Sequence, residues 1–196
     1  MPRNNRLLLR ISSVCGIVAP FITFSLILLA ISQASWFSWT ENALSDLGVE
    51  GVSSILFNSS LIIGGVLNSI FSFSLVQKHG KTGFGKAGAY LYLIDAIFLS
   101  LIGIFPETYG RLHFYVSVGF FVFLPVSLLL IAIHFLCLFG TRAWGFFTIL
   151  ISVITIIPWS LTWSGVAIPE IISASAGAVW SVMQAYTILR ATSEKT

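Results

Sequence analysis

Charged residues and cysteines are scarce in this sequence. Lys, Arg, Asp and Glu together make up only 9% of its 196 residues, so any local cluster of charge needs a physical explanation. The two cysteines, Cys15 and Cys137, fall in different apolar stretches, and we expect no disulfide framework. The net charge of +3 comes from basic residues at the ends of apolar stretches rather than from a basic stripe, which predicts no nucleic-acid partner.

The sequence is instead rich in long apolar stretches. Hydrophobic residues make up 57% of the chain and the mean hydropathy is +0.97, whereas soluble domains contain roughly 45–50% apolar residues. About 20 mostly apolar residues are needed to cross a bilayer core of roughly 30 Å. Six stretches meet this requirement and leave no room for a soluble domain. We predict a single integral membrane domain over residues 1–196, with spans at 9–32, 54–77, 87–105, 113–137, 144–163 and 170–190.

All six spans are predicted to be α-helical. Backbone groups in hydrocarbon must be paired within the segment, and the stretches lack the alternation of polar and apolar residues that barrel strands show. The fold class is therefore all-α, a polytopic bundle of six transmembrane helices. The first stretch imitates a secretory signal peptide, but its apolar run of about 20 residues exceeds the usual 7–15, and we interpret it as an uncleaved span.

The basic residues predict the orientation. Lys and Arg are enriched on the cytoplasmic side of membrane proteins. Only Arg111 falls on the side opposite to the other basic residues, so we predict a multi-pass protein of the cell membrane with both termini in the cytoplasm. The residues on which this prediction rests are Arg3, Arg6, Arg10, Lys78, Lys81, Lys86, Arg142, Arg190 and Lys195.

The first outer connection is the longest and predicts a short helix of its own. Ser38 and Glu41 have the S-x-x-E spacing of a capping box, and Gly48 supplies a left-handed stop. The helix is expected over about 39–47. Aromatic residues such as Trp36 favour a position at the headgroup level, where the helix would form a lid or rim.

The stretch FPETYGRLHFYVSVGFF, residues 105–121, concentrates charge between two spans. Pro106 ends the third span, and Gly110 assists a tight turn before the fourth. His113 then opens the fourth span, with Ser117 one turn below it. Because a histidine titrates near neutral pH, His113 is the leading candidate for an acid, a base or a ligand.

Two charged residues flank this turn at the outer interface. The planar guanidinium of Arg111 is suited to binding an anionic headgroup, while Glu107 or Asp46 would orient His113. The alternative is structural: Glu107 pairs with Arg111 or with His113, and the turn carries no chemistry.

Other polar residues are expected at the same level. The set allows nucleophilic hydrolysis, with His113 as base, Ser45 as nucleophile and Asp46 as the orienting carboxylate. Any polar membrane rim would have the same residue types, so ligand binding without catalysis stays open. The candidate ligand-binding residues are Asn58, Glu107, Arg111, Ser117 and Glu170.

No metal site and no cofactor are predicted. The three histidines, His79, His113 and His134, are expected at different depths, and the sequence has no H-E-x-x-H or G-x-S-x-G pattern. A metal held by one histidine and carboxylates stays the alternative.

A second polar group is predicted inside the membrane. By the rise of 1.5 Å per residue, Asn68, Asp95 and Gln184 each fall roughly 15–20 Å below the outer surface, so they could meet. An ionisable residue within a span is costly and by default has a function, such as carrying a proton or an ion. The alternative is that Asp95 receives hydrogen bonds from the two amides or from Tyr92 and joins helices.

Several motifs resemble those of known families. The series ENALSDLG, LFNSSLIIGG, GIFPE and LHFYVSVGFFVF resembles an uncharacterised prokaryotic six-span membrane family, domain of unknown function 998, over nearly the whole chain. The F-P turn followed by a span-opening histidine is similar, more distantly, to eukaryotic membrane proteins of the Frag1, DRAM and Sfk1 type, some of which are linked to lipid-anchor remodelling or autophagy. The resemblance supplies no reaction. It implies that the family-pattern positions in this sequence are Ser45, Asp46, Leu47, Gly48, Asn58, Pro106 and His113.

Three functions remain open at this point. The first is a polar pocket at the outer face that binds, and in one version hydrolyses or transfers, a lipid headgroup or a small polar ligand. The second is a non-catalytic accessory or scaffold subunit of a membrane complex. The third is a small transporter that uses Asp95. The expected partners are membrane lipids and other membrane subunits.

Overall fold

A computed structural model describes residues 3–80 and 83–193, with only the backbone described for residues 3 and 4. Within these ranges every regular element is a helix, and six helices are long and apolar enough to cross a membrane. These are α1 (Arg3–Ser32), α2 (Gly51–His79), α3 (Gly83–Ile104), α4 (Arg111–Cys137), α5 (Arg142–Ile156) and α6 (Ala167–Ser193). The short 3₁₀ helices are η1 (Leu44–Gly48), η2 (Glu107–Tyr109) and η3 (Ile157–Ser160), the last of which extends α5. The prediction of an all-α protein with six spans is confirmed.

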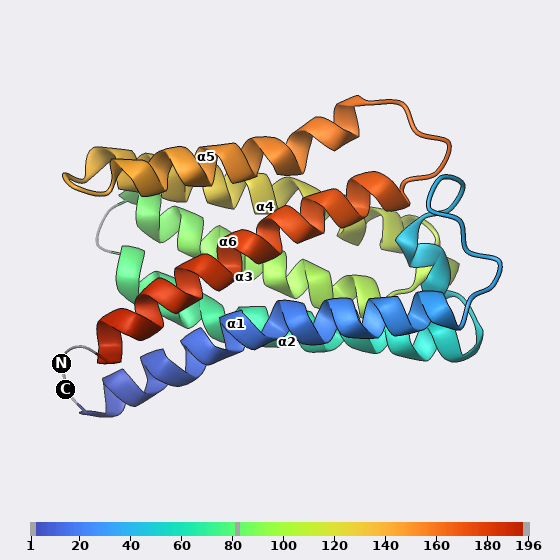
Figure 1. Cartoon of the computed structure of the whole chain (residues 1–196), viewed down its shortest axis with the longest axis horizontal. Coiled ribbons are helices and arrows are strands. Elements are labelled where there is room, and N and C mark those ends of the chain that lie inside the picture. The colour runs from blue at the N-terminus through green and yellow to red at the C-terminus, as the bar shows by residue number, and fades with distance from the viewer. Residues whose placement is uncertain (1–2, 81–82, 194–196) are drawn as a thin grey trace.

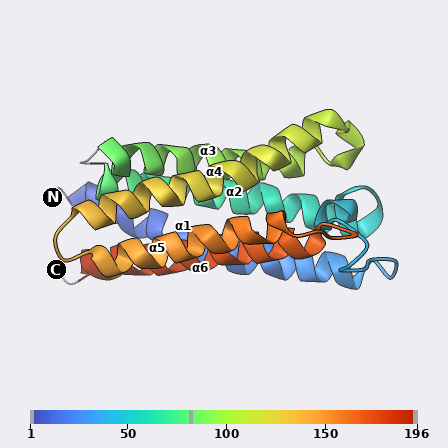
Figure 2. The ribbon, with the colours of Figure 1, turned by 90° about the horizontal axis from the view of Figure 1, so that it is seen from above.

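The six long helices form a closed ring (Figure 1, Figure 2). Each helix contacts the next one in sequence, and α6 returns to contact α1. The end of the bundle at which α1 begins and α6 ends is named the terminal end (Figure 1). The opposite end carries η1, η2 and η3 and is named the loop end.

Small residues let neighbouring helices approach closely. A Cβ atom on Gly65 of α2 would lie 2.6 Å from the Ala96 carbonyl oxygen of α3. A Cβ atom on Gly103 of α3 would lie 2.5 Å from the Asn58 carbonyl oxygen of α2. Close packing of this kind stabilises helix pairs in lipid, where the hydrophobic effect gives no driving force between them.

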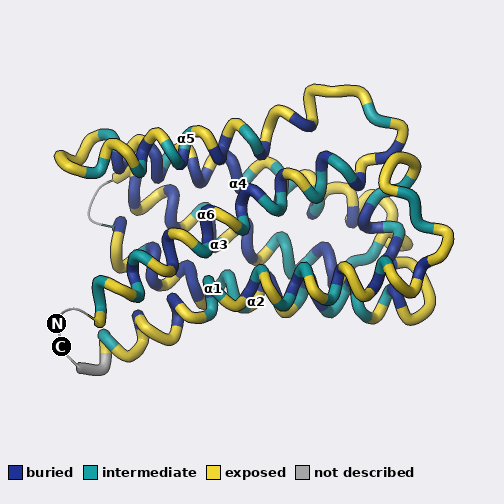
Figure 3. The backbone as a smooth tube through the Cα atoms, in the orientation of Figure 1, coloured by how far each residue is buried: buried dark blue, intermediate teal, exposed yellow. Residues whose placement is uncertain are grey.

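Burial distinguishes the interior of the ring from its outer surface (Figure 3). Toward the terminal end the interior is filled by large side chains that are almost fully buried, namely Phe71, Leu75, Leu128, Ile131 and Trp180. Large apolar side chains remain exposed on every long helix, as expected for a surface that contacts lipid.

The helix boundaries differ from the predicted spans. Every long helix begins two to six residues before the predicted start. The fifth span, predicted at 144–163, is regular only to Ile156 and continues as η3. Pro158 lies in η3 and has no N–H with which to continue the α-helical hydrogen bonding.

The predicted lid helix over 39–47 is wrong in its boundaries and in its cap. The connection contains the short η1, which follows a separate turn closed by two N–H groups on the Ser38 carbonyl. The capping side chain is Asp46, which accepts the N–H of Ala43 at 3.0 Å. The serine expected from the capping-box spacing lies six residues before η1 and belongs to the preceding turn instead.

Gly48 is required for a reason other than the one predicted. The positive φ in this connection, within the described residues, belongs to Gly51 at 71°. A Cβ atom on Gly48 would lie 2.5 Å from the side-chain oxygen of Asn58. The glycine therefore permits the close approach of η1 to α2.

Candidate functional site

The connection between α1 and α2 covers the loop end of the bundle. The N–H of Ala167, at the start of α6, donates to the Asn42 carbonyl at 2.9 Å. On the other side, Asn58 Nδ2 of α2 donates to the Gly48 carbonyl at 2.9 Å. These bonds hold η1 as a fixed cover over the ring.

His113 lies beneath the edge of this cover and is buried. Its Nδ1 lies 2.8 Å from the Phe105 carbonyl, which can only accept, so Nδ1 carries the proton. The other ring nitrogen, Nε2, is then an acceptor and receives the hydroxyl of Ser117 at 3.3 Å. The sequence correctly placed Ser117 one turn below His113, but the group that orients the imidazole is a backbone carbonyl rather than Glu107 or Asp46.

Three carboxyl groups meet beside His113. Glu170, in the first turn of α6, accepts the N–H of Leu44 at 2.6 Å and lies close enough to Glu107 and Asp46 to interact electrostatically with both. Glu107 lies close enough to Asp46 for a hydrogen bond between the two carboxyls when one of them holds a proton. Partial burial, this hydrogen bond and the negative charge of Asp46 raise the pKa of Glu107 to about 7.

A space of about 690 Å³, named the groove, opens between α4 and α5 next to these carboxyls. The two helices diverge toward the loop end (Figure 2). The polar end of the groove is lined by Ser45, Glu107, His113, Ser117 and Glu170. Its apolar wall on α4 consists of Phe114, Val118, Phe121, Val122, Pro125, Val126 and Leu129.

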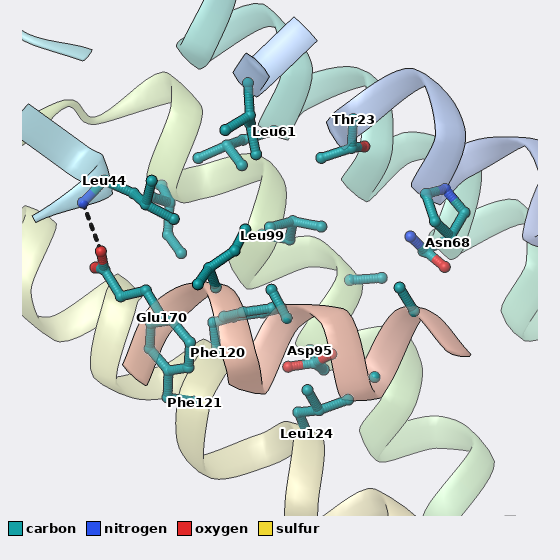
Figure 4. A pocket seen from close by; sticks show the side chains of 18 of the residues that line it. Thr23, Leu44, Leu61, Asn68, Asp95, Leu99, Phe120, Phe121, Leu124 and Glu170 are labelled. Carbon is teal, nitrogen blue, oxygen red and sulfur yellow. Dashed lines mark hydrogen bonds between the residues drawn. The ribbon is translucent and has the colours of Figure 1, made fainter. Parts of the chain in front are cut away.

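A second space of about 110 Å³, named the deep cavity, lies inside the ring (Figure 4). Residues of η1 and of every long helix except α5 line it. Its polar lining toward the middle of the bundle consists of Thr23, Asn68, Tyr92, Asp95 and Ser181. The side chains that border both the groove and the deep cavity are Ser45, Ser117, Phe121 and Glu170.

The hydrogen bonds between the polar side chains around the deep cavity do not include Asp95 Oδ1. The Tyr92 hydroxyl donates to Asn68 Oδ1 at 2.8 Å, and Asn68 Nδ2 donates to the Gly64 carbonyl at 2.9 Å. Asp95 is only 4% exposed, and its Oδ1 has no hydrogen-bond partner among the described residues. Neither Asn68 nor Tyr92 donates to Asp95 Oδ1 as expected, since the Tyr92 hydroxyl is committed to Asn68 and the Asn68 amide is held by its bond to Gly64.

Gln184 belongs to a different cluster at the terminal end. Its side chain lies close enough to that of His79 to interact with it, and the His79 ring centroid lies 5.1 Å from that of His134. The expectation that Gln184 meets Asn68 is therefore wrong. The expectation of different depths is wrong for His79 and His134, whereas His113 lies at the opposite end of the bundle. Because α2 and α4 run in the same direction, their last residues come to the same level.

Two predicted ligand-binding residues lie outside both spaces. Arg111 is exposed at the start of α4 and is absent from the described lining of the groove and of the deep cavity. Asn58 is likewise absent from both described linings, and its amide holds the Gly48 carbonyl instead. The expected contact of Arg111 with a ligand in the pocket therefore has no geometric support.

The residues considered for hydrolysis do not form the expected triad. Asp46 holds the backbone of η1, and the imidazole of His113 is oriented by Phe105. Ser45 lines the groove, but the serine that His113 binds is Ser117. The site therefore offers hydrogen-bonding groups and negative charge beside an apolar wall.

Metal ligation is not evident in the described part of the chain. There, no group of three or more His, Cys, Asp or Glu side chains could hold a metal ion. The oxygen atoms of Asp46 and Glu170 accept backbone N–H groups instead.

Sequence reasoning missed the apolar residues of the site. These are the groove wall on α4 and the phenylalanine rings around the deep cavity, namely Phe24, Phe57, Phe120 and Phe121. The sequence holds no signal for them, because a phenylalanine suits a lipid-facing surface and a cavity wall equally well.

A ring of six membrane-spanning helices with a polar site at one end defines a polytopic helical membrane protein. The chain belongs to the family described as Protein of unknown function (DUF998), which matches residues 17–187. The resemblance to this family found in the sequence is confirmed. No curated protein and no solved structure matches the chain, so the more distant likeness to Frag1, DRAM and Sfk1 proteins stays a prediction.

Proposed function

We propose that this protein binds a membrane amphiphile in the groove, with the headgroup at the polar end and an acyl chain along α4. The observation that carries the proposal is the division of the groove into a polar loop end and a continuous apolar wall. This order matches a bilayer, in which headgroups lie at the surface and acyl chains below it. The volume of about 690 Å³ lies within the usual range of roughly 300–1,000 Å³ for ligand pockets.

The acidic side chains of the groove determine which kind of headgroup it can bind. Two carboxyls, Glu107 and Glu170, line it, and the described lining contains no Lys or Arg. A phosphate headgroup would require a cationic partner such as arginine. The headgroup is therefore neutral with hydrogen-bond donors, or cationic, which replaces the anionic headgroup expected from Arg111.

The groove faces the outside of the cell in this proposal, and both termini lie in the cytoplasm. Positive charge is enriched on the cytoplasmic side of membrane proteins. Among the described residues, Arg111 is at the loop end, whereas the basic residues at the terminal end are Arg6, Arg10, Lys78, Lys86, Arg142 and Arg190. The side chain of Arg3 and residues Lys81 and Lys195, which also entered the prediction, lie outside the described residues.

Hydrolysis of the bound amphiphile is a second candidate, favoured by the 3.3 Å distance from Ser117 Oγ to His113 Nε2. In this reaction Ser117 Oγ attacks an ester carbonyl, and His113 takes the hydroxyl proton and passes it to the departing alcohol. Water then releases the acyl group from Ser117 and restores its hydroxyl. The Phe105 carbonyl would fix the tautomer of His113, as a carboxylate does in a triad.

Native mass spectrometry of the purified protein with defined lipids tests the proposal. We expect diacylglycerol, which carries no phosphate, to bind at least tenfold more tightly than phosphatidylglycerol. Val122→Trp should weaken this binding at least tenfold, because the indole fills the groove. Val179→Trp is the matched control, since Val179 is equally exposed (51% against 50%) but lies on α6 outside the groove.

Point variants at the polar end complete the test. His113→Ala should weaken lipid binding, and Arg111→Ala should leave it unchanged. Ester hydrolysis that disappears in Ser117→Ala while lipid still binds would favour the second candidate. Equal lipid binding by Val122→Trp and Val179→Trp would contradict the groove proposal and favour a non-catalytic subunit that assembles with other membrane proteins.

A further inference from the structure

The deep cavity holds a carboxyl group that the protein leaves unsatisfied. Asp95 lies nine residues before the end of α3 at Ile104, about 14 Å along the helix axis and therefore well inside the membrane. It is 4% exposed, and its Oδ1 has no hydrogen-bond partner among the described residues. Neither helix packing nor the groove proposal uses this group.

A carboxyl group at this depth is costly unless it is paired. Ionisable residues within spans usually face a cavity and interact with a partner there. The neighbouring hydroxyl of Tyr92 is committed to Asn68, and one N–H of the Asn68 amide is committed to the α2 backbone; neither side chain donates to Asp95 Oδ1. Asp95 is one of the side chains around the deep cavity (Figure 4), so a ligand in that cavity can reach it.

The lining of the deep cavity is acidic and aromatic. Its carboxyl groups are Asp95 toward the middle of the bundle and Glu170 at the loop end, and no Lys, Arg or His belongs to the described lining. Aromatic rings from four helices surround the space, and they are those of Phe24, Phe57, Tyr92, Phe120 and Phe121. Aromatic faces attract organic cations, and a carboxylate adds an opposite charge.

The size and the position of the cavity limit what can enter. About 10–15 Å³ of cavity holds one water molecule, so about 110 Å³ holds several waters or one small organic group. Toward the terminal end the space is closed, because the Tyr92 ring packs against Phe71 and Trp180 with centroid distances of 5.9 and 5.6 Å. Entry is therefore from the loop end, past the side chains shared with the groove.

We propose that the deep cavity binds a small organic ammonium ion, protonated or quaternary, which pairs with the carboxylate of Asp95 among the aromatic rings. This site is separate from the groove and does not depend on the groove proposal. The ammonium group belongs either to a free amine or to a lipid headgroup that reaches the deep cavity from the loop end. The two sources share the same chemistry at Asp95.

Thermal unfolding of the purified protein tests the site, with tetramethylammonium, choline and ethylammonium chlorides compared with sodium chloride at equal concentration. At about 100 times its Kd, the bound amine should raise Tm by about 5–10 °C. Asp95→Asn should abolish this rise. Glu50→Gln, the same chemical change at an exposed carboxyl at the start of α2, should retain it.

A second variant keeps the test valid if Asp95→Asn fails to fold. Ala174 lines the deep cavity from α6, and Ala174→Leu fills the space without a change of charge. It should abolish the amine-dependent rise, while Val122→Trp in the groove should retain it. The failure of either proposal is thus distinguishable from the failure of the other.

The outcomes are decisive in both directions. Protection by phosphatidylethanolamine added to phosphatidylglycerol vesicles, without protection by free amines, supports the site and assigns the ammonium to a lipid headgroup. Equal protection by sodium, or an undiminished amine effect in Asp95→Asn, overturns the proposal. A wild type whose Tm responds to no amine, free or lipid-borne, would overturn it as well.

Discussion

The side chain of His113 donates its Nδ1–H to the backbone carbonyl of Phe105, 2.8 Å away, and thereby joins the start of α4 to the end of α3. The last carbonyl groups of a helix have no partner within the helix, and His113 satisfies one of them. The same bond leaves Nε2 free to accept the Ser117 hydroxyl at the wall of the groove. One imidazole therefore serves both the helix connection and the candidate site.

We expect His113→Ala to lower the free energy of unfolding by about 1–3 kcal/mol, because a carbonyl at the helix end loses its donor. Ser117→Ala removes only the partner of Nε2 and should cost less than about 1 kcal/mol. Both losses can be measured by SDS-induced unfolding of the detergent-solubilised protein. Equal losses in the two variants would show that the bond to Phe105 contributes nothing specific.

The stability of the loop end should depend on pH through Glu107. Partial burial, the hydrogen bond to Asp46 and the charge of Asp46 raise the pKa of Glu107 from 4.5 to about 7. The folded protein therefore holds a proton that the unfolded chain releases, so this stabilisation is complete below about pH 4.5 and is lost as the pH rises through 7. We expect Tm to fall between pH 5 and 8. The corresponding loss in the free energy of unfolding should be less than about 1 kcal/mol, because Glu107 is largely exposed and its charge is screened by solvent.

Carboxyl-to-amide variants identify the group that causes the pH dependence of Tm. Glu107→Gln should flatten the dependence of Tm on pH, because an amide can donate to Asp46 at every pH. Glu41→Gln, at an exposed carboxyl of the cover, should leave the dependence unchanged. If Glu107→Gln titrates like the wild type, the proton belongs to another carboxyl.

Gly65→Ala should destabilise the contact between α2 and α3. The added Cβ would lie 2.6 Å from backbone atoms of α3, which cannot move aside as a flexible side chain can. We expect a loss of about 1–3 kcal/mol, as for other overpacked sites. Gly83→Ala is the control, because its Cβ meets no described atom within 4 Å, and it should be neutral or stabilising in the same unfolding assay.

The orientation of the chain can be tested by cysteine labelling in intact cells. Thr40→Cys at the loop end should react with an impermeant maleimide, and Ser193→Cys at the terminal end should not. Both positions are exposed, and both variants are made with Cys15→Ser and Cys137→Ser to remove the native thiols. Labelling of Ser193→Cys from outside would reverse the proposed topology.

The spans were predictable because the length and hydropathy of a segment are local properties. The cover was not, since its helix begins six residues after the expected cap. Ser38 closes a separate turn, and Asp46 accepts the N–H of Ala43 at the start of η1. Spacing alone cannot tell whether a serine caps a helix or closes a turn when the backbone path is unknown.

The candidate site was predictable only where residues lie on one helix. Ser117 follows His113 by four residues, so helical geometry places the two together. Gln184 and Asp95 lie on different helices, and their partners depend on how each helix is rotated about its axis. That rotation brought Gln184 to His79 and left Asp95 alone in the deep cavity.

By itself the sequence determined that the protein is an all-helical membrane protein with six spans, because lipid requires every apolar segment of that length to pair its own backbone. Only the tertiary structure decided that Arg111 lines neither space, that α4 and α5 diverge into a groove, and that aromatic rings surround the cavity of Asp95. An apolar side chain is equally well placed against lipid or against another helix. The choice between the two is made by close contacts such as that of Gly65, which exist only once the helices have packed.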